Sequence, residues 1–155
     1  MFYISFLFAA LIAPHSPQVM EEVRALPHSG NLEILENFVY VAVDDAYIHD
    51  LVHWIEPDGF EEPPYFGPGL VGAHITVISP EEMQKHGVRK IDEIGQTIRF
   101  TPRLCKVAHP GRWKEVEEVY FIEVESPELD QIRAKYGLPK QQYAFHITVG
   151  VKRAS

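Results

Sequence analysis

The tetrapeptide His-Ile-Thr-Val occurs twice in the chain, at residues 74–77 and 146–149. Each copy follows the same succession of segments: a strand-like stretch, a helix-like stretch and a loop. The first succession begins at Phe38 and the second at Tyr120, and a longer first loop accounts for their difference in length. An internal repeat of this kind predicts two similar lobes with a site between them.

Each tetrapeptide is typical of a strand, in which alternate side chains point to opposite faces. His74 and Thr76 therefore share one face, and His146 and Thr148 are arranged in the same way. Random placement of the His and Thr residues of this chain would produce about 0.2 copies of His-x-Thr. Two copies at equivalent points of a repeat indicate a functional pair rather than ordinary strand composition.

Two histidines and two threonines suit chemistry at a phosphodiester. Imidazole has an unperturbed pKa of about 6.5, so one ring can take a proton while the other gives one. The threonine hydroxyls can hold the phosphate oxygens. This mechanism requires no metal and no cofactor, and we expect none. A zinc site is the alternative, but Cys105 is the only cysteine and no HExxH spacing occurs, so no motif names the remaining ligands.

The paired motifs, together with the segment 119–152, resemble the two-histidine (2H) phosphoesterase superfamily, especially its RNA-ligase-like and RNA-repair-like branches. The resemblance covers roughly residues 37–153. It implies an α+β fold of two lobes with pseudo-twofold symmetry, in which antiparallel sheets line a central cleft and helices pack outside. It also implies that His74 and His146 are catalytic and that Thr76 and Thr148 bind the phosphate.

The same resemblance implies a substrate among 2′,3′-cyclic phosphates, 2′-5′ linkages and related RNA or nucleotide ends. We therefore expect a metal-independent phosphodiesterase. Two alternatives stay open. One is a non-catalytic module that binds a nucleotide or RNA end, and the other is a metallohydrolase. The sequence does not divide the acid and base roles between the histidines.

Three further residues are weaker candidates for substrate binding. Lys152 has the same strand parity as the second motif, which would let it meet a phosphate at the rim of the site. Tyr65 and Tyr143 lie just before the two motif strands, as does Phe66. A base stacked on an aromatic ring there would contribute about 1 to 3 kcal/mol. For each of these residues, packing or simple surface exposure is the alternative interpretation.

The charge of the chain limits its partners. Its 22 acidic and 14 basic side chains give a formal charge of -8, whereas proteins that follow a long nucleic acid usually present a basic surface. We therefore expect a small nucleotide or a short RNA end rather than a long polymer. The locally basic stretch 99–114 is compatible with such a ligand, and equally with a solvated surface.

The first thirteen residues are uncharged and too short to span a bilayer as a helix. Their length fits the apolar part of a secretory signal, although no Lys or Arg precedes them, and an extra buried element is the alternative. Location therefore stays open between cytoplasmic and exported. We divide the chain into an N-terminal extension, 1–36, and a two-lobed domain, 37–155, and take a monomer as the default.

Propensity and capping signals predict the remaining elements. Ser16 and Asp45 are candidate helix N-caps, and Ser79 with Glu82 forms a candidate capping box. Gly137 is placed to end the last helix. We expect helices over about 18–26, 46–56, 80–86 and 127–136, and strands over about 38–44, 73–79, 97–107, 117–125 and 145–152.

Overall fold

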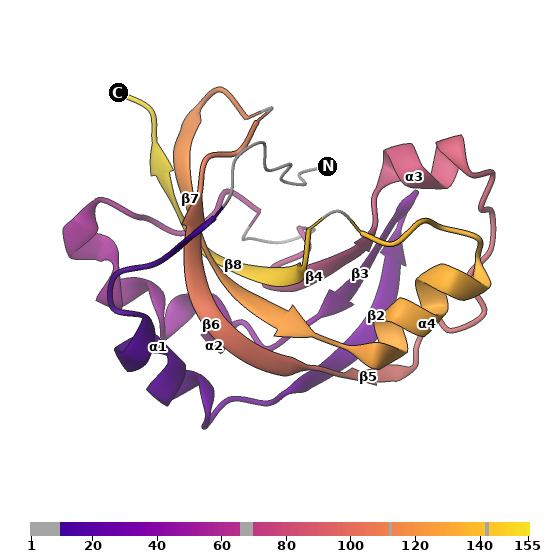
Figure 1. Ribbon diagram of the computed structural model, residues 1–155, viewed down its shortest axis with the longest axis horizontal. Helices are drawn as coiled ribbons and strands as arrows, with labels where there is room; N and C mark the ends of the chain where they lie inside the picture. The colour runs from indigo at the N-terminus through magenta and orange to yellow at the C-terminus, as the bar shows by residue number, and fades with distance from the viewer. Residues whose placement is uncertain (1–9, 66–69, 112, 142) are drawn as a thin grey trace.

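The computed structural model describes residues 10–65, 70–111, 113–141 and 143–155 (Figure 1). Phe66 and the first nine residues of the apolar start therefore lie outside the described residues. Within the described ranges, eight strands form one antiparallel sheet. The strands are β1 (Leu11–Ile12), β2 (Ser29–Leu35), β3 (Phe38–Ala42), β4 (His74–Ile78), β5 (Thr97–Arg99), β6 (Thr101–Ala108), β7 (Val116–Glu125) and β8 (Phe145–Arg153).

The order of strands across the sheet is β1-β6-β7-β8-β4-β3-β2-β5. The two motif strands, β4 and β8, therefore lie side by side in the middle, and each has three further strands on its outer side (Figure 1). In each half, the strand that precedes the motif strand in this repeat lies on its outer side: β3 flanks β4, and β7 flanks β8. The pair Ile75 and Ile147 joins the two halves. This arrangement confirms the expected α+β fold with a duplicated half, and it unites the expected antiparallel sheets in one.

The helices are short and share one core. They are α1 (Ser16–Val23), α2 (Ala46–His49), α3 (Pro80–Lys85) and α4 (Pro127–Lys135), with 3-10 turns η1 (Val52–Trp54) and η2 (Glu56–Asp58). Helix α2 follows β3 but packs against β8, whereas α4 follows β7 and packs against β4. Each half thus covers the motif strand of the other, which helps to hold β4 and β8 together.

The motif strands are amphipathic, as their sequences require. The side chains of Ile75, Val77, Ile147 and Val149 are fully buried in the main core, together with side chains from all four helices. Because alternate residues point to opposite faces, the His and Thr side chains of both motifs lie on the other face of the sheet. On that face, a smaller apolar cluster packs beside them around Phe121.

Of the two predicted helix caps, Ser16 is wrong, while Asp45 has the predicted position without the predicted bond. Ser16 is the first residue of α1, and His15 occupies the cap position with a φ of 64°. The Ser16 hydroxyl instead accepts a hydrogen bond from the Cys105 amide, 3.1 Å away, and so ties α1 to β6. Asp45 makes no capping bond to α2. Its carboxylate accepts from the Ala73 amide at 3.1 Å, because the tertiary fold brings that amide beside it.

Other local predictions were closer. The capping box of Ser79 and Glu82 is present, and Gly137 follows α4 with a φ of 71°. The predicted helix over 46–56 breaks into α2, η1 and η2, and Pro57 in η2 has no amide hydrogen for an α-helical bond. The predicted strand over 97–107 divides at Phe100 into β5, which pairs with β2, and β6, which pairs with β7.

Residues 11–35 supply β1, α1 and β2 to the sheet and its core. Strand β2 is interior, since it pairs with β3 on one side and with β5 on the other. The sequence analysis did not predict this strand, because only Leu32 of its side chains is buried and no alternating apolar pattern marks it. None of the helices formed by the described residues is long and apolar enough to span a membrane.

Candidate active site

The register of the two central strands brings the four motif residues together. Ile75 lies opposite Ile147 in an antiparallel pair. One step to either side, His74 therefore falls opposite Thr148, and Thr76 falls opposite His146. Directly opposed residues in such a pair have Cβ atoms about 4.5 to 5.5 Å apart. Two imidazoles and two hydroxyls thus occupy alternate corners of one small patch on the sheet.

Both histidines are oriented in the same way by their own backbone. His74 Nδ1 donates a hydrogen bond to the carbonyl oxygen of Gly72 at 2.8 Å, and His146 Nδ1 donates to that of Ala144 at 3.2 Å. In each case the acceptor is the residue two positions earlier. A carbonyl can only accept, so each neutral ring carries its proton on Nδ1 and its lone pair on Nε2. The two histidines therefore share the orientation of their rings as well as their sequence motif.

Burial favours the neutral form of these rings. His74 is only 7% exposed, and burial lowers its pKa to about 4, against the hydrogen bond to Gly72, while the nearby charge of His146 lowers it further. Burial also lowers the pKa of His146, and the hydrogen bond to Ala144 and the carboxylate of Glu123 oppose that shift. The effect of His146 on the pKa of His74 is what their placement on neighbouring strands predicts.

Aromatic rings enclose the first histidine on several sides. The centroids of Phe38, Tyr40 and Tyr65 lie 5.6, 5.9 and 4.8 Å from that of His74, all in edge-to-face orientation. Such contacts fix an imidazole in one orientation and exclude water from its sides. Across the sheet, Phe121 lies 5.1 Å from His146. The two rings therefore differ in their surroundings although they share a motif.

Tyr65 connects the two halves of the site. It is 3% exposed, and its hydroxyl forms a hydrogen bond with Thr148 while its ring packs against His74. Burial raises the pKa of Tyr65, against that hydrogen bond, so the phenol stays neutral. The sequence predicts Tyr65 near the site as a stacking residue for a base. The structure places it there as a buried partner of Thr148.

The comparison with known families agrees with this geometry. Residues 39–155 match the family described as the Swiss Army Knife 2H phosphoesterase domain. The chain belongs to this family. Searches of curated proteins and of solved structures found no match. The resemblance to the 2H phosphoesterase superfamily is therefore confirmed, while the RNA-ligase-like and RNA-repair-like branches stay expectations.

The loop before β4 of this 2H phosphoesterase is held by Asp45 and Gly72. The Gly72 amide donates to the carbonyl oxygen of Tyr65 at 3.0 Å, and its own carbonyl holds His74. Gly72 has a φ of +67°, and a Cβ there would lie 2.7 Å from Asp45 Oδ1. Any larger residue would be strained and would crowd this carboxylate. The glycine thus allows the turn that positions both Tyr65 and His74.

Lys152 does not share a face with the motif side chains, contrary to the parity predicted from the sequence. A β-bulge places Thr148 opposite Phe121 but Gly150 opposite Tyr120, so Val149 is an extra residue in β8. Beyond the bulge, Lys152 pairs with Glu118 and lies on the face of Tyr120, away from the motif side chains. There its ammonium group is 3.1 Å from Glu118 and 4.9 Å from the centre of the Phe60 ring. The structure therefore separates Lys152 from the other candidates.

The last candidate, Tyr143, is 37% exposed in the loop that leads into β8.

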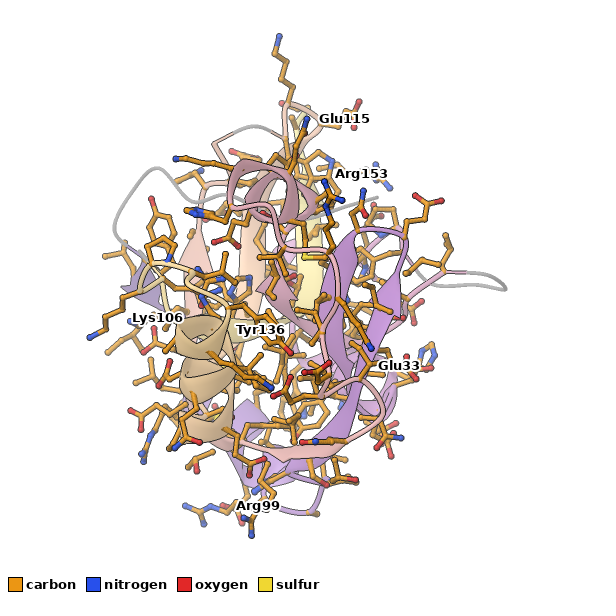
Figure 2. The ribbon with its side chains drawn as sticks, turned by 90° about the vertical axis from the view of Figure 1, so that its right-hand side faces the viewer. Glu33, Arg99, Lys106, Glu115, Tyr136 and Arg153 are labelled. Carbon is orange, nitrogen blue, oxygen red and sulfur yellow. The ribbon has the colours of Figure 1, made fainter. Side chains whose placement is uncertain are left out.

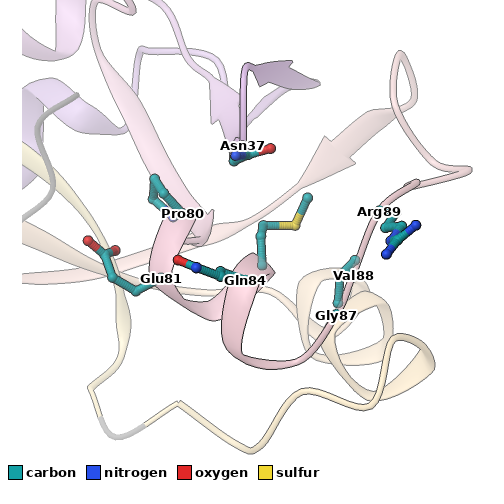
Figure 3. Close-up of a pocket in the computed structure, with 8 residues that line it drawn as sticks. Asn37, Pro80, Glu81, Gln84, Gly87, Val88 and Arg89 are labelled. Carbon is teal, nitrogen blue, oxygen red and sulfur yellow. The ribbon is translucent and has the colours of Figure 1, made fainter.

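A pocket of about 570 Å³ lies away from the motif residues, between α3 and the turn from β2 to β3 (Figure 3). It is lined by Asn37, Pro80, Glu81, Met83, Gln84, Gly87, Val88 and Arg89, none of them a motif residue. Among the residues that the structure describes, no three His, Cys, Asp or Glu side chains are grouped as metal ligands.

Glu123, which the sequence did not single out, lies near the motifs together with Lys106 of the basic stretch 99–114. Glu123 on β7 lies directly opposite His146, and its carboxylate is 2.7 Å from the ammonium group of Lys106 on β6. The available signal was a single acidic residue inside the apolar run 119–124. Only the register of β7 against β8 identifies His146 as its neighbour.

Proposed function

We propose that this 2H phosphoesterase is a metal-independent phosphodiesterase that opens 2′,3′-cyclic phosphates on small nucleotides or RNA ends. The observation that carries the proposal is the alternating patch of two histidines and two threonines on β4 and β8. Its size suits one phosphorus centre, and both imidazoles have the same tautomer. The net charge of -8 favours a small substrate over a long polyanion.

In the proposed reaction, water attacks the phosphorus atom of the cyclic ester. One histidine takes a proton from the water, and the bond between phosphorus and one ribose oxygen breaks. The other histidine, in its imidazolium form, donates its Nε2 proton to that departing oxygen and becomes neutral, which leaves a phosphomonoester and a ribose hydroxyl. Thr76 and Thr148 bind the non-bridging oxygens, where negative charge increases in the transition state. Acid-base catalysis of this kind contributes typically 10²- to 10⁴-fold.

The test is hydrolysis of 2′,3′-cyclic mononucleotides, with cyclic-phosphate-ended RNA and 2′-5′ oligonucleotides in parallel and EDTA present throughout. We expect turnover that survives the chelator, and a kcat lowered by about 10²- to 10⁴-fold in His74→Ala and in His146→Ala. His53→Ala is the control, because His53 lies on η1 and takes no part in the patch.

Three outcomes would contradict the proposal. Full turnover by either motif variant would show that the paired histidines are not catalytic. Loss of activity with EDTA would favour a metallohydrolase. Calorimetric binding of a cyclic nucleotide that stays intact would favour the non-catalytic module.

A further inference from the structure

The two halves differ at one pair of corresponding positions. His146 on β8 lies opposite Glu123 on β7, whereas His74 on β4 lies opposite Ala42 on β3. These positions correspond because β7 precedes and flanks β8 as β3 precedes and flanks β4. One motif histidine therefore has a carboxylate as its neighbour in this pairing, and the other has a methyl group.

The carboxylate of Glu123 is held in place. Lys106 Nζ lies 2.7 Å from it, and each side chain is 26% exposed. Lys106 lies opposite Phe121, and Phe121 in turn lies opposite Thr148, so the ion pair is on the same face as the motif side chains. Figure 2 shows Lys106 on one flank of the molecule and Glu33 on the other. Partial burial strengthens the effect of this charge on its neighbours.

Other polar groups of the described residues lie near His146 by strand register. Thr76 lies opposite it on β4, His74 lies on the same strand, Tyr40 follows on β3 across Thr76, and Tyr65 approaches through Thr148. Burial raises the pKa of Tyr40, with Glu33 adding to the shift. Burial likewise raises that of Tyr65, so both phenols are neutral at pH 7. Burial keeps His74 neutral as well. Within this set, Glu123 supplies the negative charge, and Lys106 offsets part of it.

We propose that Glu123, fixed by Lys106, makes His146 the histidine that carries the catalytic proton, while the aromatic surroundings of His74 keep that ring unprotonated. Given the proposed function, His74 is then the base toward water and His146 the acid toward the ribose oxygen. Glu123 touches no reacting atom in this scheme. It is a positioning residue that acts through His146.

The experiment compares wild type, Glu123→Gln and Lys106→Met by NMR titration of the His146 Cε1 proton and by the pH profile of kcat/KM. In Glu123→Gln, we expect the pKa of His146 and the basic limb of the profile to fall by about 0.5 to 1 pH unit. The acid limb of the kcat/KM profile, which reports the pKa of His74, should not move. Lys106→Met should move the basic limb the other way, because the carboxylate then acts without a compensating cation.

Glu125→Gln is the matched control. Glu125 lies on the same strand and is paired with Arg103 of β6, as Glu123 is paired with Lys106, but no motif histidine lies opposite it. In Glu125→Gln, both limbs of the pH profile and the NMR titration of His146 should match those of wild type. The proposal is overturned if Glu123→Gln moves the acid limb, or lowers the rate equally at every pH. If wild type hydrolyses none of the substrates, the proposed function fails, while the NMR titration still decides whether Glu123 controls the protonation of His146.

Discussion

At the scale of single residues, identical motifs have acquired different chemical properties. His74 and His146 share sequence, tautomer and backbone anchor, yet rings enclose the first and a carboxylate neighbours the second. Burial removes water that would stabilise an imidazolium ion, whereas a nearby carboxylate replaces part of that stabilisation. Under the proposed function, two copies of one tetrapeptide serve as base and acid without any difference within the tetrapeptide itself.

Burial of His74 predicts a pH-dependent stability. Its folded pKa of about 4 lies below the unfolded value of about 6.5, so only the unfolded chain binds a proton as the pH falls between these values. The free energy of unfolding should therefore decrease below pH 6.5 and lose about 3 kcal/mol from this group by pH 4. Urea unfolding from pH 7 to pH 4, compared with His74→Gln, measures the effect. Equal pH dependence in the two proteins would refute it.

The contact between Tyr65 and Thr148 predicts a catalytic effect of a single hydroxyl. Tyr65→Phe keeps the ring against His74 but removes the hydrogen bond that orients the Thr148 hydroxyl. We expect kcat/KM to fall by about 3- to 10-fold, as for loss of about 1 kcal/mol. Steady-state kinetics of Tyr65→Phe, Thr148→Ala and the double variant check this. If the two effects simply add, the residues do not act together.

At the scale of elements, the ends of β4 and α4 are joined by a buried arginine. Arg133 is 4% exposed and donates to the carbonyl oxygens of Val77 and Pro139 at 2.8 Å each. It also binds both carboxylate oxygens of Glu82, at 3.0 and 2.6 Å. Glu82 in turn accepts from the Ser79 amide at the start of α3. Helices of both halves are thereby tied to the end of one motif strand.

This network predicts a large loss of stability in Arg133→Met. The variant removes the Arg133 donor from Glu82 and from two carbonyl groups. We expect a cost of about 2 to 4 kcal/mol in urea unfolding, since Glu82 keeps the Ser79 amide and some exposure to water. Replacing Glu82 by Met as well should restore part of the loss. Arg99→Gln is the control, because Arg99 is highly exposed at one end of the molecule (Figure 2) and its pair with Glu128 is solvated. Equal stability of Arg133→Met and wild type would show that the network is not stabilising.

At the scale of the whole molecule, the site depends on a sheet that extends beyond the region matched to the family. Residues 39–155 match, but β2 precedes them and pairs with both β3 and β5. Strand β3 in turn positions Tyr40 opposite Thr76 and Ala42 opposite His74. Loss of β2 would leave β3 at an edge and separate β5 from the sheet.

A chain of residues 37–155 should therefore fail to fold cooperatively. It lacks β2, whose Leu32 is fully buried in the core, and both hydrogen-bonded neighbours of that strand would lose their partner. Circular dichroism during urea unfolding, beside the full chain, measures cooperativity. A sharp transition and retained hydrolysis in the shortened chain would contradict this expectation.

Local sequence was sufficient wherever the cause of structure is local. Strand parity predicted that His74 and Thr76 share a face, capping chemistry predicted the start of α3, and the repeat predicted two related halves. These features depend on neighbours a few residues apart, and their periodicity is visible in the chain. The same reasoning failed for Lys152. A bulge at Val149 moves the later side chains of β8 to the opposite face, and no sequence pattern indicates this bulge.

Tertiary structure alone decided what surrounds the motifs. The Asp45 carboxylate accepts from the Ala73 amide instead of capping α2, Tyr65 contacts Thr148, and Glu123 lies beside His146. Each contact joins residues far apart in the chain, so it depends on strand register and loop path rather than on propensity. The sequence by itself therefore determined which groups take part in the proposed chemistry. The folded sheet determined which of them share a surface, how deeply each is buried and which charge lies beside it.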